Sequence, residues 1–169
     1  MRKRVIIGID PDVEMSGVGR VERDTRAVWA DRLPFPLLVD YLREVQVECQ
    51  RRDAELCVYI ESTRQTTHNW HLKPSDSRAV AAVKGRNVGA MQEVGKLIAE
   101  MCEHYGINVT ERPPFRKCWK GKDGKITHEE LSFITGWNKK RSNQEERDAL
   151  LIAWVEAGLP IKMKFNYGK

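Results

Sequence analysis

Val5-Ile6-Ile7-Gly8-Ile9-Asp10-Pro11 decides the fold of this chain, together with Ser16-Gly17-Val18-Gly19 a few residues later. Residues 4–9 are apolar on both faces and rich in β-branched side chains, a pattern typical of a fully buried strand. Asp10 ends this strand, and the chain then turns into a second short strand. We therefore expect Asp10 at the rim of a buried sheet, where it can act as a metal ligand if later elements bring further carboxylates to it.

Hydrophobic patterning divides the rest of the chain into strands and helices. Strands over 17–22 and 27–30, joined by a turn at 23–26, predict an antiparallel meander with the first strand. The other expected elements are a helix over 37–52, a strand over 56–60, a polar irregular segment over 62–84, a helix over 87–104, a strand over 107–109, a basic loop over 113–125, a short helix over 127–135 and a last helix that begins near Ser142 and ends before Gly158. This order predicts an α/β mixed sheet with helices on both faces.

Length and composition indicate a single soluble domain. The 169 residues suit one domain, which we place at 1–160, followed by a basic tail at 161–169. No apolar run approaches the roughly 18 residues that a membrane span needs. The apolar run near the N-terminus is too short for a signal peptide and ends on a charge. We therefore expect a cytoplasmic protein with no membrane partner.

Charge and cysteine content narrow the class of partner. The net charge of +5 favours polyanions such as nucleic acids, although many soluble proteins share such an excess. The four cysteines are scattered, with no CxxC motif and no histidine at zinc-finger spacing. We therefore expect buried or half-buried free thiols at Cys49, Cys57, Cys102 and Cys118.

Four carboxylates stand where a sheet and a helix could bring them together. Asp10 and Glu61 each end a buried strand, and Glu145 and Asp148 share one face of the last helix because they are three residues apart. Acids gathered in this way repel one another unless a cation lies between them. Oxygen ligands alone suit Mg²⁺ or Mn²⁺, and two such ions can activate a water and stabilise the leaving oxygen of a phosphodiester.

Each acid also has a simpler interpretation. An acid at the end of a strand often begins a solvated loop, and this holds for Asp10 and Glu61 taken singly. Ser142-Asn143-Gln144-Glu145 has the form of a capping box, in which Glu145 would fold back to the start of the helix. Asp148 is the stronger candidate, because it directly precedes an apolar run where burial of an unpaired acid would be costly.

The order of these motifs resembles the RuvC family of Holliday-junction resolvases over residues 4–155. The resemblance rests on Gly8-Ile9-Asp10-Pro11, on Glu61 after a later strand, on Gly85-Arg86-Asn87-Val88-Gly89, and on Glu145 with Asp148-Ala149-Leu150. It implies an RNase H-like nuclease domain in which Asp10, Glu61, Glu145 and Asp148 are catalytic and bind two Mg²⁺ or Mn²⁺ ions. It also implies a homodimer that uses the helix from Asn87. Asp12 departs from the family, which usually has glycine there, and is either a turn residue or a spare ligand.

Basic and aromatic residues extend the resemblance to DNA. Arg112-Pro113-Pro114-Phe115-Arg116-Lys117 resembles the basic segment of the family, which implies phosphate contacts near Lys117 and Lys125. The alternative for these cations is a solvated face. Trp70 lies in a polar stretch, where it either covers the edge of the core or stacks on an unpaired base. The expected DNA-binding residues are Trp70, Arg112, Arg116, Lys117 and Lys125.

The resemblance predicts a metal-dependent endonuclease that resolves four-way DNA junctions by paired phosphodiester hydrolysis, with a role in DNA recombination and repair. Two alternatives remain open: a related nuclease acting on RNA or on branched DNA generally, and a non-catalytic nucleic-acid-binding module. An ATP-binding kinase-like domain, which can begin with a similar motif, would need a second glycine-rich phosphate loop and a second lobe. A chain of 169 residues has no room for either.

Overall fold

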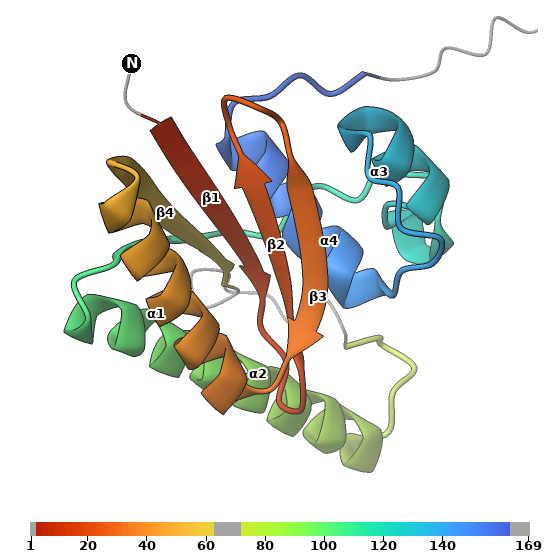
Figure 1. The fold of residues 1–169 in the computed structure, drawn as a ribbon. Helices are drawn as coiled ribbons and strands as arrows, with labels where there is room; N and C mark the ends of the chain where they lie inside the picture. Colours follow the sequence, from red (N-terminus) through yellow and green to blue (C-terminus); the bar gives the residue numbers. More distant parts are fainter. Residues whose placement is uncertain (1–2, 63–71, 163–169) are drawn as a thin grey trace, which may run out of the picture.

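A five-stranded mixed sheet forms the centre of the computed structural model, which describes residues 3–62 and 72–162 (Figure 1). The strands are β1 (Lys3–Asp10), β2 (Ser16–Glu22), β3 (Val28–Leu33), β4 (Ala54–Glu61) and β5 (Asn108–Arg112). Their order across the sheet is β3-β2-β1-β4-β5. β1, β2 and β3 pair in antiparallel fashion, whereas β4 runs parallel to both β1 and β5. This is the RNase H-like α/β arrangement expected from the sequence, so the predicted fold class is confirmed.

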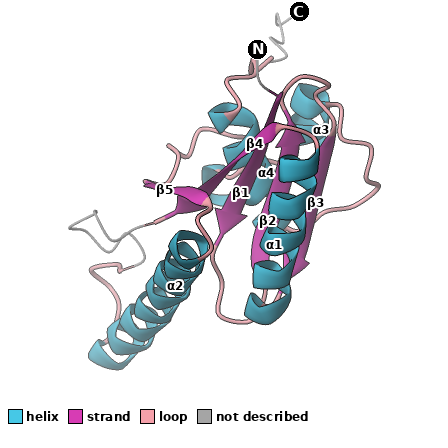
Figure 2. Ribbon diagram, turned by 60° about the vertical axis from the view of Figure 1, so that its left-hand side comes forward, coloured by secondary structure: helices cyan, strands magenta, loops and turns pink. Residues whose placement is uncertain are grey.

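Helices cover both faces of the sheet (Figure 2). One face carries α1 (Phe35–Arg51) and α2 (Arg78–His104), and the other carries α3 (His128–Thr135) and α4 (Gln144–Glu156). A short 3-10 helix, η1 (Lys122–Gly124), lies in the basic loop. None of the helices in the described ranges is long and apolar enough to cross a membrane.

The alternation of side chains along β1 produces two separate cores. Ile7 and Ile9 point to one face and pack with Leu38 of α1 and Ile98 of α2, while Ile6 points to the other face and packs with α3 and α4. These side chains are fully buried. A strand buried on both faces must be apolar throughout, which explains the continuous apolar run that opens the sequence.

Glycines on β1 and β2 let α4 lie unusually close to the sheet. A Cβ atom on Gly8 would come within 2.7 Å of the Ala153 amide nitrogen, and one on Gly19 within 2.5 Å of the Leu150 amide nitrogen. Real Cβ atoms do not approach backbone this closely, so any larger residue would push α4 away. The glycines around Asp10 therefore have a packing role that fixes the distance of α4 from β1.

A network of charged side chains connects α1 to the C-terminal end of β2, away from Asp10. Arg20 donates to Glu48 at 2.9 Å, and Arg52 donates to Glu22 at 2.8 Å. Arg20 also pairs with Glu22, and Arg52 with Glu48. The hydrogen bond from Arg20 lowers the pKa of Glu48 despite the opposing effect of burial. The network therefore favours the charged form of Glu48 in the folded protein.

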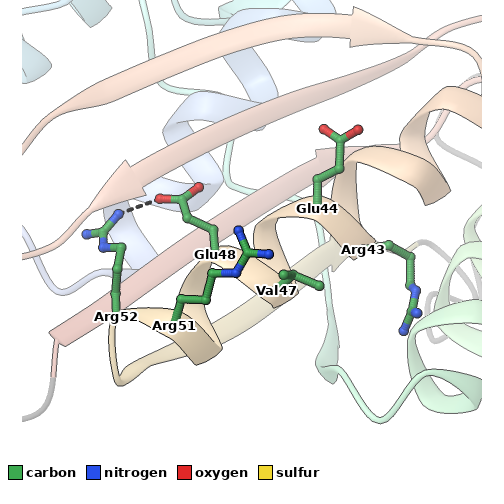
Figure 3. A pocket seen from close by; sticks show the side chains of 6 residues that line it. All are labelled: Arg43, Glu44, Val47, Glu48, Arg51 and Arg52. Atoms are coloured by element: carbon green, nitrogen blue, oxygen red, sulfur yellow. Dashed lines mark hydrogen bonds and ion pairs between the residues drawn. The ribbon is translucent and has the colours of Figure 1, made fainter.

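A hollow of about 530 Å³ lies on the outer side of α1 (Figure 3). All of its lining side chains come from the end of α1 and the residue after it, and the charged pair of Arg52 and Glu48 closes one end. α1 leads directly into the start of β4, so this hollow lies toward the opposite end of the parallel strands from Asp10 and Glu61. Of its lining residues, Glu48 and Arg52 belong to the α1–β2 charge network, and none is one of the four site acids.

The predicted helix over 87–104 begins earlier than expected. α2 starts at Arg78, where the Ser77 hydroxyl accepts from the Val80 amide at 3.3 Å, so the irregular segment predicted over 62–84 is wrong for its last residues. Leu97 in the C-terminal half of α2 is 41% exposed, whereas Ile98 beside it is fully buried. This part of α2 therefore has one buried face and one face in contact with solvent.

The cysteines largely follow expectation. Cys49, Cys57 and Cys102 are buried free thiols, whereas Cys118 is exposed and the prediction of burial is wrong there. Cys118 lies in the basic loop, which runs over the surface and leaves its side chain in solvent.

Candidate active site at the ends of β1 and β4

Asp10 and Glu61 end neighbouring parallel strands. Ile9 of β1 pairs with Ile60 of β4, and each of these buried residues is followed at once by the acid. Parallel strands end at the same edge of a sheet, so both carboxylates emerge together. Both side chains are partly exposed, at the boundary between the core and solvent.

α4 begins beside the same edge and supplies the other two acids. Asp10 pairs with Gly17 across β1 and β2, and the backbone of Glu145 packs directly onto Gly17. Asp148 lies one turn further along α4, on the same face as Glu145. In Figure 1 the start of α4 lies at the end of the sheet where β1 finishes. The structure thus places all four predicted site acids at one end of the sheet.

The pKa values show that these carboxylates share one electrostatic environment. Burial raises the pKa of Asp10 well above its usual range, and the negative charges of Glu61, Asp148 and Glu145 raise it further. Burial also raises the pKa of Glu61 and of Asp148. The positive charge of Lys125 opposes all three of these shifts, but it compensates the negative charge of the site only in part.

Each acid of α4 faces a polar or basic partner. The Gln144 side chain donates to Asp148 Oδ1 at 2.6 Å, and the Lys125 ammonium lies 3.4 Å from Asp148 Oδ2. Arg32 of β3 lies 4.0 Å from Glu145. With the side chains in these positions, residues 3–62 and 72–162 contain no group of three His, Cys, Asp or Glu side chains arranged to hold a metal ion.

The donor set nevertheless fits a hard divalent cation in its chemistry. Four carboxylates supply only oxygen ligands, which suit Mg²⁺ or Mn²⁺. The raised pKa of Asp10 reflects a site where burial and neighbouring acids disfavour another negative charge. A bound cation would reverse that penalty. Asp10, Glu61, Glu145 and Asp148 are therefore the residues that would hold such an ion.

Glu145 is not a capping residue. Asn143 caps α4 by accepting from the Glu146 amide at 2.9 Å, and the Glu146 side chain accepts from the Asn143 amide at 3.1 Å. The capping box therefore lies one residue later than the Ser142–Glu145 box considered as an alternative from the sequence, and Ser142 is not the cap. Glu146 is buried and also accepts from Lys139 at 2.7 Å. This arrangement leaves the Glu145 carboxylate available to the site.

Asp12 is a turn residue in this structure. Its Oδ1 atom accepts from the amides of Glu14 at 2.9 Å and Met15 at 3.3 Å, which closes the loop between β1 and β2. Of the two interpretations open for Asp12, the contacts support the turn.

Basic residues line the β4–β5 side of the site. Arg112, which pairs with Glu61 across β4 and β5, donates to Glu156 at 2.8 Å and stacks 3.5 Å above the centre of the Phe115 ring. Lys117 and Lys125, together with Arg112, act to lower the pKa of Glu61 against the effect of burial. The predicted cations at 112, 117 and 125 are thus close enough to the acids to influence them. Arg116 lies in the same loop and is exposed.

Trp70 lies outside the described residues, so its two interpretations stay as predictions. His128 is the first residue of α3, and its Nδ1 atom lies 2.8 Å from the Ser142 hydroxyl. This contact joins α3 to the segment before α4. Trp137 is buried in the core beside α4.

The sheet order and its two helical layers define an RNase H-like α/β protein. No protein-family model matches the chain, and no curated protein matches its sequence. Solved structures with similarity include Thermus thermophilus RuvC in complex with a Holliday junction substrate, at 17% identity and a TM-score of 0.45 over 92% of this chain and 96% of that one. A second structure of Thermus thermophilus RuvC has 19% identity and a TM-score of 0.41, covering 92% and 97%.

The large terminase nuclease from thermophilic phage G20c is similar at a comparable level, with 14% identity and a TM-score of 0.42 over 91% of this chain and 82% of that one. Resolvase and terminase nuclease structures thus both resemble this chain at low identity. The comparisons do not single out the RuvC family.

Proposed function

We propose that this protein is a divalent-metal-dependent endonuclease that cuts four-way DNA junctions. The observation that carries the proposal is the meeting of Asp10, Glu61, Glu145 and Asp148 at one end of the sheet, next to Lys117 and Lys125. Acids and lysines side by side suit a substrate that is itself a polyanion and needs a metal for hydrolysis. The order of the acids along the chain supports the resolvase class.

The four acids of the proposed site come from two parts of the fold. Asp10 and Glu61 are fixed by the paired ends of two central strands, so they form the rigid half of the ligand set. Glu145 and Asp148 complete it from α4. Two Mg²⁺ or Mn²⁺ ions held by such carboxylates would supply an activated water and stabilise the leaving oxygen of a phosphodiester. The protein positions these four groups and the DNA backbone relative to one another.

The basic residues are proposed to hold the DNA. Arg116 and Lys117 are exposed in the loop after β5, and Lys125 lies at the rim of the acidic site. Contacts of this kind are made to phosphates and do not distinguish one base sequence from another. Arg112 is also assigned to this surface, although its side chain is largely engaged by Glu156 and Phe115. Trp70 is retained as a candidate for stacking at the crossover.

A homodimer is the assembly that paired cleavage favours. Resolving one junction needs two nicks on opposing strands, and a chain of this size has one set of the four acids, so a two-fold dimer supplies two sites. The N-terminal half of α2 extends away from the sheet in Figure 1 and exposes Val80 at 43% and Val83 at 46%. Gly85 and Gly89, further along, have open space around them. This half of α2 is the proposed dimer surface.

The proposal is tested with a labelled four-way junction, a linear duplex of the same sequence and an RNA–DNA hybrid, each incubated in Mg²⁺, Mn²⁺ or Ca²⁺. We expect paired cuts in the junction with Mg²⁺ or Mn²⁺, and little cutting of the linear duplex. Cleavage of the hybrid or of all substrates alike would replace the junction assignment with a broader nuclease. Junction binding without cleavage under every condition would instead identify a nucleic-acid-binding module.

A further inference from the structure

Arg147 occupies the centre of a hydrogen-bond network beside the acidic site. Its Nε atom donates to the Ile126 carbonyl at 3.0 Å, and its Nη1 atom donates to the Ser142 carbonyl at 2.7 Å and the Ser142 hydroxyl at 3.1 Å. Its Nη2 atom donates to the Gln144 side-chain oxygen at 2.9 Å. One guanidinium thus joins the basic loop, the segment before α4 and the first turn of α4.

Gln144 connects Arg147 to Asp148 through two hydrogen bonds. Because Gln144 Oε1 accepts from Arg147, its amide nitrogen is turned toward Asp148 Oδ1, to which it donates at 2.6 Å. The same nitrogen lies 3.5 Å from the Ile126 carbonyl. Without the bond from Arg147 the side-chain amide of Gln144 could rotate, and Asp148 would lose a fixed donor.

The network also fixes Lys125. Ile126 is buried, and its carbonyl is the acceptor that both Arg147 and Gln144 reach. Lys125 directly precedes Ile126, and its ammonium lies 3.4 Å from Asp148 Oδ2. Holding the backbone at Ile126 against α4 therefore keeps Lys125 beside Asp148. Both oxygens of the Asp148 carboxylate are thus oriented by groups that depend on Arg147.

We propose that Arg147 is a positioning residue that presets the Asp148 carboxylate and the Lys125 ammonium for a divalent cation and a DNA phosphate. The proposal rests on the metal-dependent function proposed above. The positive charge of Arg147 acts to lower the pKa of Asp148 directly, but the hydrogen bonds of Arg147 orient the Asp148 carboxylate through Gln144 and Ile126. Groups that orient a metal ligand in this way typically change metal affinity or activity by about 10- to 100-fold when they are removed.

Arginine is required at this position because of its shape. Its planar guanidinium donates in three directions at once, to Ile126, Ser142 and Gln144. A lysine ammonium is a single compact group on a flexible stem and cannot reproduce that fork. The start of α4 already has its own capping box, formed by Asn143 and Glu146. The bonds of Arg147 to the basic loop therefore add an orientation that the helix does not need for its own formation.

Calorimetric titration of the whole protein with Mn²⁺ tests this inference. We compare wild type with Arg147→Lys, Arg147→Met and Gln144→Met, and we use Arg141→Met as the control. Arg141 is exposed just before α4, so its replacement removes one positive charge at the same end of the helix. We expect the three network variants to bind Mn²⁺ about tenfold more weakly or worse, and the control to bind like wild type.

Thermal unfolding of the same metal-free proteins separates positioning from folding. The inference requires that Arg147→Lys keeps an unfolding midpoint near that of wild type while its Mn²⁺ affinity falls. Wild-type affinity in all three network variants would overturn it, as would a weaker affinity found only in variants that are already partly unfolded. If wild type binds Mn²⁺ and the variants match it, only this inference fails. If wild type binds neither Mn²⁺ nor Mg²⁺, the metal-dependent function itself is overturned.

Discussion

The backbone carbonyl of Glu145 packs against Gly17, the residue that pairs with Asp10 across β1 and β2. This contact sets the distance between the end of the first strand and the start of the last helix. No side chain fits between them, because even a Cβ atom on Gly17 would overlap the Glu145 backbone. The position of two candidate ligands thus depends on a residue that has no side chain.

The glycine contacts predict a stability effect that can be measured directly. Gly19→Ala should lower the free energy of unfolding by about 1–3 kcal/mol, since its methyl group would press on the Leu150 backbone. Gly89→Ala is the matched control at a concentration where the protein is monomeric, because Gly89 lies within α2 with open space around it in one protomer. The control should be neutral or stabilising by up to about 1 kcal/mol. Urea denaturation measures both, and equal stability of Gly19→Ala and wild type would contradict the close packing.

Asp10→Asn should abolish cleavage of a four-way junction while leaving junction binding intact or tighter. The change removes a proposed ligand and a negative charge, but it leaves the basic residues in place. The same result is expected for Glu61→Gln and Asp148→Asn. Asp12→Asn is the control, because an asparagine oxygen can still accept the two turn amides. A cleavage assay and a gel-shift assay measure the two properties, and full activity in Asp148→Asn would refute the proposed site.

Replacing Lys117 and Lys125 together with alanine should weaken junction binding and make it less sensitive to salt. Each lysine that no longer neutralises a phosphate reduces the slope of log affinity against log salt by about 0.9, so the slope of the double variant should fall by up to about two units. Lys96 and Arg51, which are on α2 and α1, provide a control pair that removes the same amount of charge. Binding isotherms across salt concentrations give the slopes. An equal reduction in both double variants would indicate a general charge effect.

The charge network between α1 and β2 predicts a pH-dependent contribution to stability. Arg20 and Arg52 lower the pKa of Glu48 in the folded protein below its usual value of 4.5. A carboxylate with a lowered folded pKa stabilises the protein above about pH 4.5, and this contribution is lost as the pH falls through the folded pKa. Glu48→Gln should therefore be less stable than wild type at pH 7, with the difference shrinking toward pH 3.

Urea unfolding of wild type and Glu48→Gln at several pH values measures that difference. Because the comparison is between two proteins with the same remaining acids, titration of Asp10 and Glu61 largely cancels. Glu44→Gln is a suitable control, as Glu44 lies on the same helix and lines the hollow beside the network. A difference between wild type and Glu48→Gln that stays constant from pH 7 to pH 3 would exclude the proposed linkage.

Sedimentation of the free protein should give a dimer at micromolar concentration. Val80→Asp together with Val83→Asp should return the protein to a monomer, because two charges would be placed in the proposed surface on α2. Val47→Asp is the control, since Val47 is similarly exposed at 38% on the outer side of α1. A wild-type monomer that stays monomeric on the junction and nicks one strand would remove both the dimer and the resolvase assignment.

The sequence was sufficient to predict the mixed sheet and the strand ends at which Asp10 and Glu61 lie. A strand such as β1, buried on both faces, must be apolar throughout, so the acid that ends it can be recognised in the sequence. α2 was harder to delimit, because Gly85 and Gly89 resembled a helix entrance. They lie inside the helix and are tolerated there with open space around them. Ser77 carried the true start signal, a side chain that accepts from the helix amide three residues later.

The detailed chemistry around Asp148 depends on contacts that the sequence does not reveal. Both Ser142 with Glu145 and Asn143 with Glu146 match the capping pattern, and the hydrogen bond that the buried Glu146 accepts from Lys139 favours the second. Arg147 is adjacent to Asp148, yet its role depends on the Ile126 carbonyl, which reaches it only through the fold. A local pattern could identify the acid but not the groups that orient it.

The glycine-lined contact between β1 and α4 has a consequence for the synthesis of the protein. β1, β2 and β3 are consecutive and pair with one another, so they can assemble while later residues are still being made. α4 follows every other described element and leaves the ribosome after them. A nascent chain therefore carries Asp10 and Glu61 long before Glu145 and Asp148 can join them. Under the proposed function, the capacity to cut DNA therefore arises only when the last helix docks onto the sheet.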